Sequence, residues 1–283
     1  TNRNVKWIRP KEITRNDVSE FYGLLEKKYE PATFNKALQS LQTFIDFLIN
    51  TEDIIMKNYF KGCMRQHVPK KQIDILTKEE FEAILKAIDN YTPYKKTTHA
   101  GRMDNMYYPW LKDAFKIFLF IGGRREEVLS LKWSDIIVSE RGVKFFKIIN
   151  WKVQKIKKRV NDEEFKLAPI GSDFEKLLTQ MGMNEKLGTD EKLIDAENKF
   201  TLGTLMEKLT DAFTHYRIGA CIKKEVTLKH LRKTYLTWTN YYMGNDTGKV
   251  STAGGNKVLR DYYLAPDILT LNEIAALKVN IFG

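Results

Sequence analysis

Apolar side chains recur at three- and four-residue steps along the first sixty residues, which is the spacing of amphipathic helices. A first helix is predicted from Thr14, because Asp17 then lies in the first turn and favours the positive helix end. Its apolar face consists of Val18, Phe21, Leu24 and Leu25. A second helix, predicted from Thr33, has an apolar stripe of Phe34, Ala37, Leu38, Leu41, Phe44, Ile45 and Leu48. A third and shorter helix is predicted from Ile54 to Phe60, so the pattern indicates a small helical domain.

A basic, proline-broken stretch follows, Val68-Pro69-Lys70-Lys71. Extended segments of this kind are typical of linkers. Beyond it, Thr77 and Glu80 have the spacing of a capping box in front of a new apolar run. The predicted organisation is therefore a helical domain at 1–68, a linker at 69–76 and a second domain at 77–283.

The second domain should be mainly helical with one small sheet. A polar stretch with a proline and a glycine, 90–106, predicts a loop, and the apolar run 107–120 predicts a helix. The pattern then changes to that of two strands joined near Asn161-Asp162. The apolar strand positions are Val143, Phe145, Ile148, Ile149 and Trp151, then Phe165, Leu167 and Pro169. Helices are expected again at 173–181, 201–218 and 268–277. The expected fold class is α+β, mainly α with a small antiparallel β-sheet.

The net charge is +11 and the pI about 9.3, which favours a polyanionic partner: DNA, RNA or an anionic membrane surface. The segment 144–159 contains no acid and carries Lys144, Lys147, Lys152, Lys155, Lys157, Lys158 and Arg159. Such a density of positive charge, without acidic residues between, indicates contact with phosphates. The sequence contains no run of 18 apolar residues, so no membrane span is predicted. Cys63 and Cys221 lack metal-ligand spacing, so we expect two buried thiols in a reducing compartment, the cytoplasm.

Two further stretches carry candidate chemistry. In 121–136 a Gly-x-Arg turn is followed by a Glu three residues on, then by Leu, Trp and Asp. In 227–264, Lys229 and Arg232 are three residues apart and would lie side by side on a helix, while Tyr262 and Tyr263 follow about thirty residues later. Guanidinium, amine and phenol groups brought together by folding suit nucleophilic attack by a tyrosine on a phosphodiester.

In this order, the two motifs resemble those of the tyrosine recombinases, the phage-integrase family, across roughly residues 77–270. The resemblance is to recombinases of mobile genetic elements. It implies a helical core-binding domain and a catalytic domain that clamp double-stranded DNA, with the protein nucleoid-associated. The implied reaction is site-specific DNA cutting and rejoining, as in DNA integration, through a covalent 3′-phosphotyrosyl intermediate and without a cofactor or metal. It also implies a homotetramer on DNA with exchange of the C-terminal helix; docking of that helix on its own domain is the alternative.

The resemblance also assigns roles to individual residues. Arg124 and Arg232 would stabilise the scissile phosphate, and Lys229 occupies the position that the family fills with His or Lys. Arg124 is preferred to Arg125 because the family's arginine stands at the turn. Glu127, one helical turn on, would orient Arg124. An exposed charged helix is the alternative for this run of arginines and glutamates.

The nucleophile is assigned to Tyr263, because the Leu264-Ala265-Pro266 that follows matches the family's ending, and Tyr262 would then have a packing role. In the family a hairpin lysine protonates the departing 5′-hydroxyl. Lys152, at the end of a predicted strand, is the first candidate for this general acid, and Lys155 is the alternative.

His230 and the remaining basic residues are given supporting roles. Helix geometry turns His230 about 100° from Lys229, so a backbone contact is weighed against a role in the site. DNA contacts are expected from Lys70, Lys71, Lys157, Lys158 and Arg159.

One position departs from the family pattern. The family places a His or Trp nine or ten residues before the nucleophile, where this chain has Gly254 or Ala253. Lys257, Asn256 or Lys249 is a candidate substitute, unless an inserted loop at 244–252 disturbs the count. This departure motivates one alternative function, a sequence-specific DNA-binding regulator with weak or no catalysis. A type IB topoisomerase, which shares the chemistry, is another.

Overall fold

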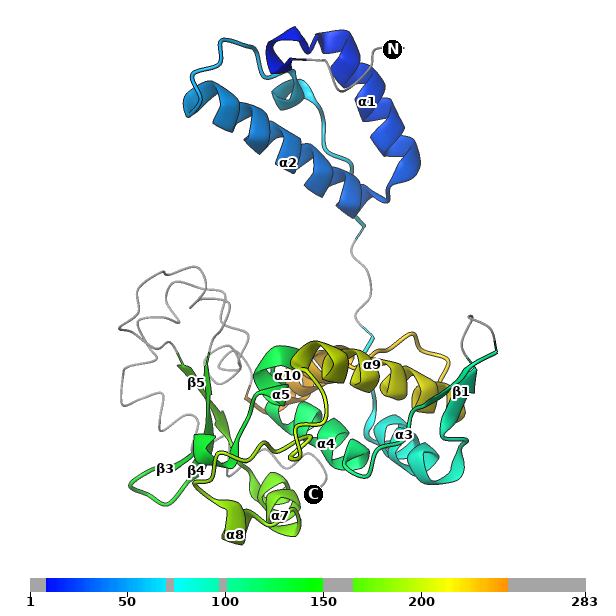
Figure 1. The fold of residues 1–283 in the computed structure, drawn as a ribbon, viewed down its shortest axis with the longest axis vertical. Helices are drawn as coiled ribbons and strands as arrows, with labels where there is room; N and C mark the ends of the chain where they lie inside the picture. Colours follow the sequence, from blue (N-terminus) through cyan, green and yellow to red (C-terminus); the bar gives the residue numbers. More distant parts are fainter. Residues whose placement is uncertain (1–8, 70–73, 97–100, 150–164, 244–283) are drawn as a thin grey trace. The chain divides into compact units, whose positions relative to one another are not determined.

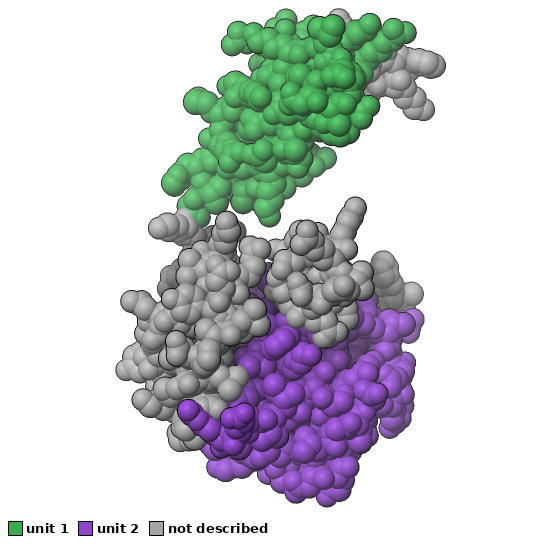
Figure 2. Space-filling view, turned by 90° about the vertical axis from the view of Figure 1, so that its left-hand side faces the viewer, with its two compact units in different colours: residues 1–72 green, residues 73–283 purple. Residues whose placement is uncertain are grey.

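A computed structural model describes residues 9–69, 74–96, 101–149 and 165–243 of the chain (Figure 1). The chain divides into two compact units, unit 1 at 1–72 and unit 2 at 73–283 (Figure 2). The predicted linker 69–76 spans the division between them, and its residues 70–73 lie outside the described residues. None of the described helices combines the length and the apolar character that crossing a bilayer requires.

The described residues of unit 1 form the helices α1 (Arg15–Lys28) and α2 (Pro31–Asn50) and the short 3-10 turns η2 (Pro10–Glu12) and η3 (Tyr59–Gly62). The start predicted for α1 is confirmed: Thr14 caps the helix, and the Asp17 carboxylate accepts a hydrogen bond of 2.8 Å from the Thr14 backbone N–H. The start predicted for α2 was two residues late, because Pro31 is a favoured first helical residue.

The buried face of α1 differs from the prediction. Val18 and Leu25 are buried and Tyr22 packs against them, whereas Phe21 and Leu24 are 40% and 64% exposed. Positions 18, 22 and 25 follow one another at steps of four and three, so the helix turns Phe21 and Leu24 away from α2. The core of unit 1 is formed by Val18, Leu25, Phe34, Leu38, Ile45, Leu48 and Phe60.

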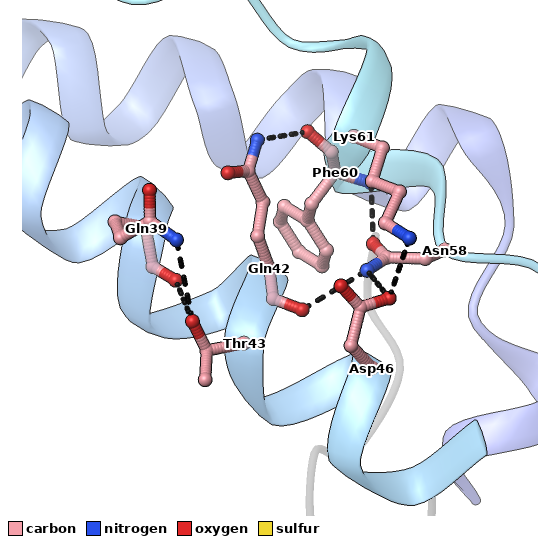
Figure 3. A network of polar contacts seen from close by, with 7 residues as sticks. All are labelled: Gln39, Gln42, Thr43, Asp46, Asn58, Phe60 and Lys61. Carbon is pink, nitrogen blue, oxygen red and sulfur yellow. Dashed lines mark hydrogen bonds and ion pairs between the residues drawn. The ribbon is translucent and has the colours of Figure 1, made fainter. Parts of the chain in front are cut away.

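The third helix predicted for this unit, from Ile54 to Phe60, is wrong. Asn58 redirects the chain into the short turn η3 instead (Figure 3). Its side-chain amide donates hydrogen bonds to the Gln42 carbonyl (3.0 Å) and to the Asp46 carboxylate (2.9 Å), and its side-chain oxygen accepts one from the Phe60 backbone N–H (3.1 Å). Side-chain bonds of this kind offer the backbone an alternative to helix formation.

Unit 2 is mainly helical. Its helices are α3 (Lys78–Asn90), α4 (Leu111–Ile121), α5 (Arg125–Leu129), α7 (Ser172–Gln180), α8 (Met183–Lys186), α9 (Leu202–Gly219) and α10 (His230–Met243). The capping box of Thr77 and Glu80 in front of α3 is confirmed. Helix α4 begins four residues later than predicted, because Pro109 disfavours a helical conformation in the residue before it.

Two antiparallel sheets accompany these helices. Strands β1 (Tyr94–Lys96) and β2 (Met103–Asn105) pair within the stretch that was predicted to be a loop. Strands β3 (Ile136–Val138), β4 (Lys144–Ile149) and β5 (Phe165–Pro169) form a second sheet in the order β3-β4-β5. Strands β4 and β5 confirm the two predicted apolar runs, whereas β3 was not predicted. The connecting segment 150–164 lies outside the described residues.

Helix α4 is the centre of unit 2. It is buried along almost all of its length and packs against α5, α7 and α10. It therefore fixes the place where the chain turns at Gly122-Gly123. The mainly helical fold with small antiparallel sheets confirms the predicted fold class. The two thiols do not match the prediction, since Cys63 is partly exposed and Cys221, just beyond the end of α9, is exposed.

Candidate active site

The first motif forms the turn between α4 and α5. Gly122 ends α4 in the left-handed conformation (φ 57°), where glycine is favoured. A side chain here would also collide with α10, since a Cβ on Gly122 would lie 2.1 Å from Cδ1 of Tyr235. Arg124 then precedes the first residue of α5, with its side chain 39% exposed. Gly122 thus lets α10 approach this turn closely.

Glu127 holds Arg124 from within the protein. Its Oε1 accepts a hydrogen bond of 2.6 Å from the Arg124 guanidinium, and its Oε2 accepts one of 2.9 Å from the Arg124 backbone N–H. Burial alone would raise the pKa of Glu127, but these bonds and the nearby Lys166 ammonium outweigh burial and lower it. Glu127 is therefore an ionised, buried carboxylate that fixes both the backbone and the side chain of Arg124.

Arg232, from the second motif, reaches the same turn. It lies on the first turn of α10 and donates a hydrogen bond of 2.7 Å to the carbonyl of Gly122, two residues before Arg124. Burial lowers the pKa of its guanidinium. The Glu127 carboxylate raises that pKa and the positive charge of Arg124 lowers it further. The structure therefore brings together the two arginines that the sequence placed 108 positions apart.

Lys166, which sequence reasoning missed, completes the cluster. It lies on β5, is 5% exposed, and donates a hydrogen bond of 3.1 Å from Nζ to Oε1 of Glu127. Burial lowers its pKa, and Arg124 and Arg232 lower it further, while Glu127 raises it. Three basic side chains against one carboxylate give this cluster a formal charge of +2. A concentrated positive charge of this kind suits an anionic ligand such as a phosphate.

Lys229 and His230 stand at the start of α10. Lys229 is exposed and lies in the turn immediately before the helix, one residue earlier than the helix on which it was predicted to lie with Arg232. The Nδ1 of His230 accepts a hydrogen bond of 2.9 Å from the backbone N–H of Thr227. Burial and the neighbouring Lys233 lower the pKa of His230. His230 thus makes a backbone contact that holds the entry to the helix.

The other predicted site residues lie outside the described residues. They are Lys70, Lys71, Lys152, Lys155, Lys157, Lys158, Arg159, Lys257, Tyr262 and Tyr263. Their roles stay predictions. Across the described ranges, no group of three or more His, Cys, Asp and Glu side chains could hold a metal ion.

No protein-family model matches the sequence, and no curated protein matches it. Solved structures do. The 75–356 fragment of lambda integrase, a dimer bound to a COC′ core site, has a TM-score of 0.62 and 16% identity over 90% of this chain and 81% of that chain. The 82–397 fragment of the Tn1549 transposon integrase, in complex with circular intermediate DNA, has a TM-score of 0.58 and 16% identity over 94% of this chain and 86% of that chain.

A lambda integrase tetramer bound to a Holliday junction has a TM-score of 0.61 and 14% identity, over 89% of this chain. The chain spans 64% of the length of that integrase. At such identities the likeness concerns the fold. These matches show that this chain has the fold of the tyrosine recombinases.

Proposed function

We propose that this protein is a site-specific DNA recombinase that cuts and rejoins double-stranded DNA through a covalent 3′-phosphotyrosyl intermediate. One observation carries the proposal: the Arg232 guanidinium is bound to the Gly122 carbonyl, at the turn that presents Arg124. The likeness of the fold to integrases in complex with DNA supports it. The net charge of +11 supports a polyanionic partner.

In the proposed reaction Tyr263 loses its phenol proton to water, its oxygen forms a bond to the scissile phosphorus, and the bond from phosphorus to the 5′-oxygen breaks. Lys152, with Lys155 as the alternative, gives its proton to that leaving oxygen. A phosphodiester carries one negative charge and its pentacoordinate transition state carries two, so Arg124, Arg232 and Lys229 act most strongly on the transition state. The 5′-hydroxyl of a partner strand then reverses the step and releases Tyr263.

The nucleophile requires this cationic surrounding. A phenol with a pKa of roughly 10 is mostly protonated at neutral pH and is then a poor nucleophile. Positive charge around it favours the phenolate. The formal charge of +2 at Arg124, Glu127, Lys166 and Arg232 would act both on the phenol and on the phosphate.

DNA contacts outside the reacting phosphate are assigned to basic residues that lie before the cluster in the sequence or between Glu127 and Lys166. These are Lys70, Lys71, Lys157, Lys158 and Arg159. Strand exchange between two duplexes needs four cuts, so we propose a homotetramer on DNA that is coupled by the C-terminal helix. A lambda integrase tetramer on a Holliday junction has a similar fold, which supports this assembly.

The proposal is tested with nicked suicide duplexes of randomised core sequence. Cleavage next to the nick releases a short strand that cannot be religated, and the protein stays attached to DNA under denaturing conditions. We expect the wild-type protein and Tyr262→Phe to form this adduct and Tyr263→Phe to form none. Sequencing the captured duplexes then gives the target site.

Other outcomes of the same experiment identify the alternatives. Tight binding to DNA without an adduct from the wild-type protein would contradict catalysis and indicate a DNA-binding regulator, the function that the Gly254 and Ala253 positions favour. An adduct combined with relaxation of supercoiled DNA, but without exchange between two captured sites, would indicate a topoisomerase instead.

A further inference from the structure

Lys166 is a cation in the interior of unit 2. Among the lysines and arginines that the structure describes, Lys166 alone is buried. Burial of an ammonium group costs several kcal/mol unless a well-placed partner compensates for it. A lysine in such a position is therefore expected to have a purpose beyond filling space.

The partner of Lys166 is the carboxylate that holds Arg124. Both cations donate to the same oxygen, Oε1 of Glu127: Lys166 at 3.1 Å and Arg124 at 2.6 Å. The other oxygen, Oε2, accepts from the Arg124 backbone N–H. Three donors thus fix one carboxylate, and the Glu127 side chain is only 2% exposed.

Strand β5 supplies a rigid support for this contact. Lys166 pairs with Ile148 of β4, the central strand of the three-stranded sheet, and the next pair on the same face is Phe146 with Ala168. Ile148, Phe146 and Ala168 all belong to the core of unit 2. The sheet therefore fixes Lys166, Lys166 fixes Glu127, and Glu127 fixes the half-exposed guanidinium of Arg124.

We propose that Lys166 is a positioning residue, which acts through Glu127 to hold the Arg124 guanidinium in place for the scissile phosphate. This inference rests on the proposed recombinase function. Lys166 also neutralises part of the negative charge of Glu127. Without it, the carboxylate would pair with Arg124 alone and compete with the phosphate for that guanidinium.

The test uses the full chain and the captured suicide duplex at saturating concentration, so that the rate of adduct formation is measured separately from DNA affinity. Lys166→Met removes the charge and keeps the length of the side chain, and Lys166→Arg keeps the charge. Glu127→Gln and the double variant of Glu127→Gln with Lys166→Met test whether the two residues act together. Lys186→Met is the matched control, because Lys186 forms a surface ion pair with Glu191 in the same unit.

We expect Lys166→Met to form the adduct about 10- to 100-fold more slowly, since small misplacements of a catalytic group reduce rates by such factors. Lys166→Arg should recover most of the rate, and Lys186→Met should react like the wild type. The double variant should be no slower than Glu127→Gln alone, because Lys166 acts only through Glu127. A general loss of folding would instead slow the double variant further.

The outcomes separate the two proposals. A wild-type protein that forms an adduct, with Lys166→Met equally fast or with additive losses in the double variant, overturns the role of Lys166 and leaves the recombinase function intact. A wild-type protein that forms no adduct overturns the function and this role together. Urea unfolding of each variant identifies misfolded samples. Recovery of the rate by Lys166→Arg then shows that the charge at position 166 is what the reaction needs.

Discussion

Gly122 permits a direct test of how the two motifs meet. Replacing it with alanine would place a Cβ 2.1 Å from Cδ1, 2.6 Å from Cγ and 2.9 Å from Cε1 of Tyr235. The residue also has a φ of 57°, in the left-handed region. The conformation costs roughly 1–2 kcal/mol for an L-residue and the overlap with a packed ring roughly 1–3 kcal/mol, so Gly122→Ala should destabilise unit 2 by about 2–5 kcal/mol.

The matched control is Gly142→Ala. Gly142 also has a positive φ, 79°, but no atom lies within 4 Å of the position where its Cβ would be. This variant should therefore carry only the conformational cost, roughly 1–2 kcal/mol. The difference between the two variants isolates the contact between the α4–α5 turn and α10.

Urea unfolding followed by tryptophan fluorescence measures this difference, because Trp110, Trp133, Trp151 and Trp238 lie in unit 2 and only Trp7 lies in unit 1. We expect Gly122→Ala to unfold at clearly lower urea than Gly142→Ala. The adduct assay should also show a loss for Gly122→Ala, since its carbonyl holds Arg232. Equal unfolding midpoints for the two variants would refute the close approach of Tyr235 to this turn.

Two further predictions concern buried polar contacts. The folded state lowers the pKa of Glu127 below its ordinary 4.5, so the unfolded chain binds more protons in the window between the two values. The resulting stability is fully present above pH 4.5 and is lost as the pH falls through the folded pKa. In thermal unfolding, the melting temperature should therefore fall more steeply with acid for the wild type than for Glu127→Gln. Parallel curves for the two proteins would contradict this. In unit 1, Asn58→Ala removes the bonds to Gln42, Asp46 and Phe60 and should cost about 1–3 kcal/mol. Thermal unfolding measures this loss against Ser40→Ala, an exposed residue of the same unit whose hydroxyl donates to the Lys36 carbonyl.

Local signals were enough to predict the capped helix starts at Thr14 and Thr77, but not the starts of α2 and α4. The hydroxyl of Thr14 and the carboxylate of Asp17 satisfy backbone groups within the same turn, so their effect depends little on the rest of the chain. The buried face of α1 depends on what packs against it. Phe21 and Leu24 fit a helical stripe as well as Tyr22 does, and only the position of α2 decides between them.

Lys166 shows the same limit in the candidate site. The strand pattern was assigned from Phe165, Leu167 and Pro169, which predicts that Lys166 faces solvent. The alternate positions Ala168 and Ile170 belong to the core, and Lys166 is on their side of the strand. A signal was present in that second apolar set, but a lysine becomes favourable there only through Glu127, 39 residues earlier in the chain. A pattern within one strand cannot reveal such a partner.

The hydrogen bond from Arg232 to the Gly122 carbonyl joins residues 110 positions apart. Contacts between such distant positions close a long loop, and loop closure has an entropic cost that nearby contacts avoid. During synthesis the Gly122 turn emerges well before Arg232, so a growing chain has Arg124 before it has Arg232. The turn that presents Arg124 thus lacks its hydrogen bond from Arg232 in a nascent chain until α10 has docked on α4.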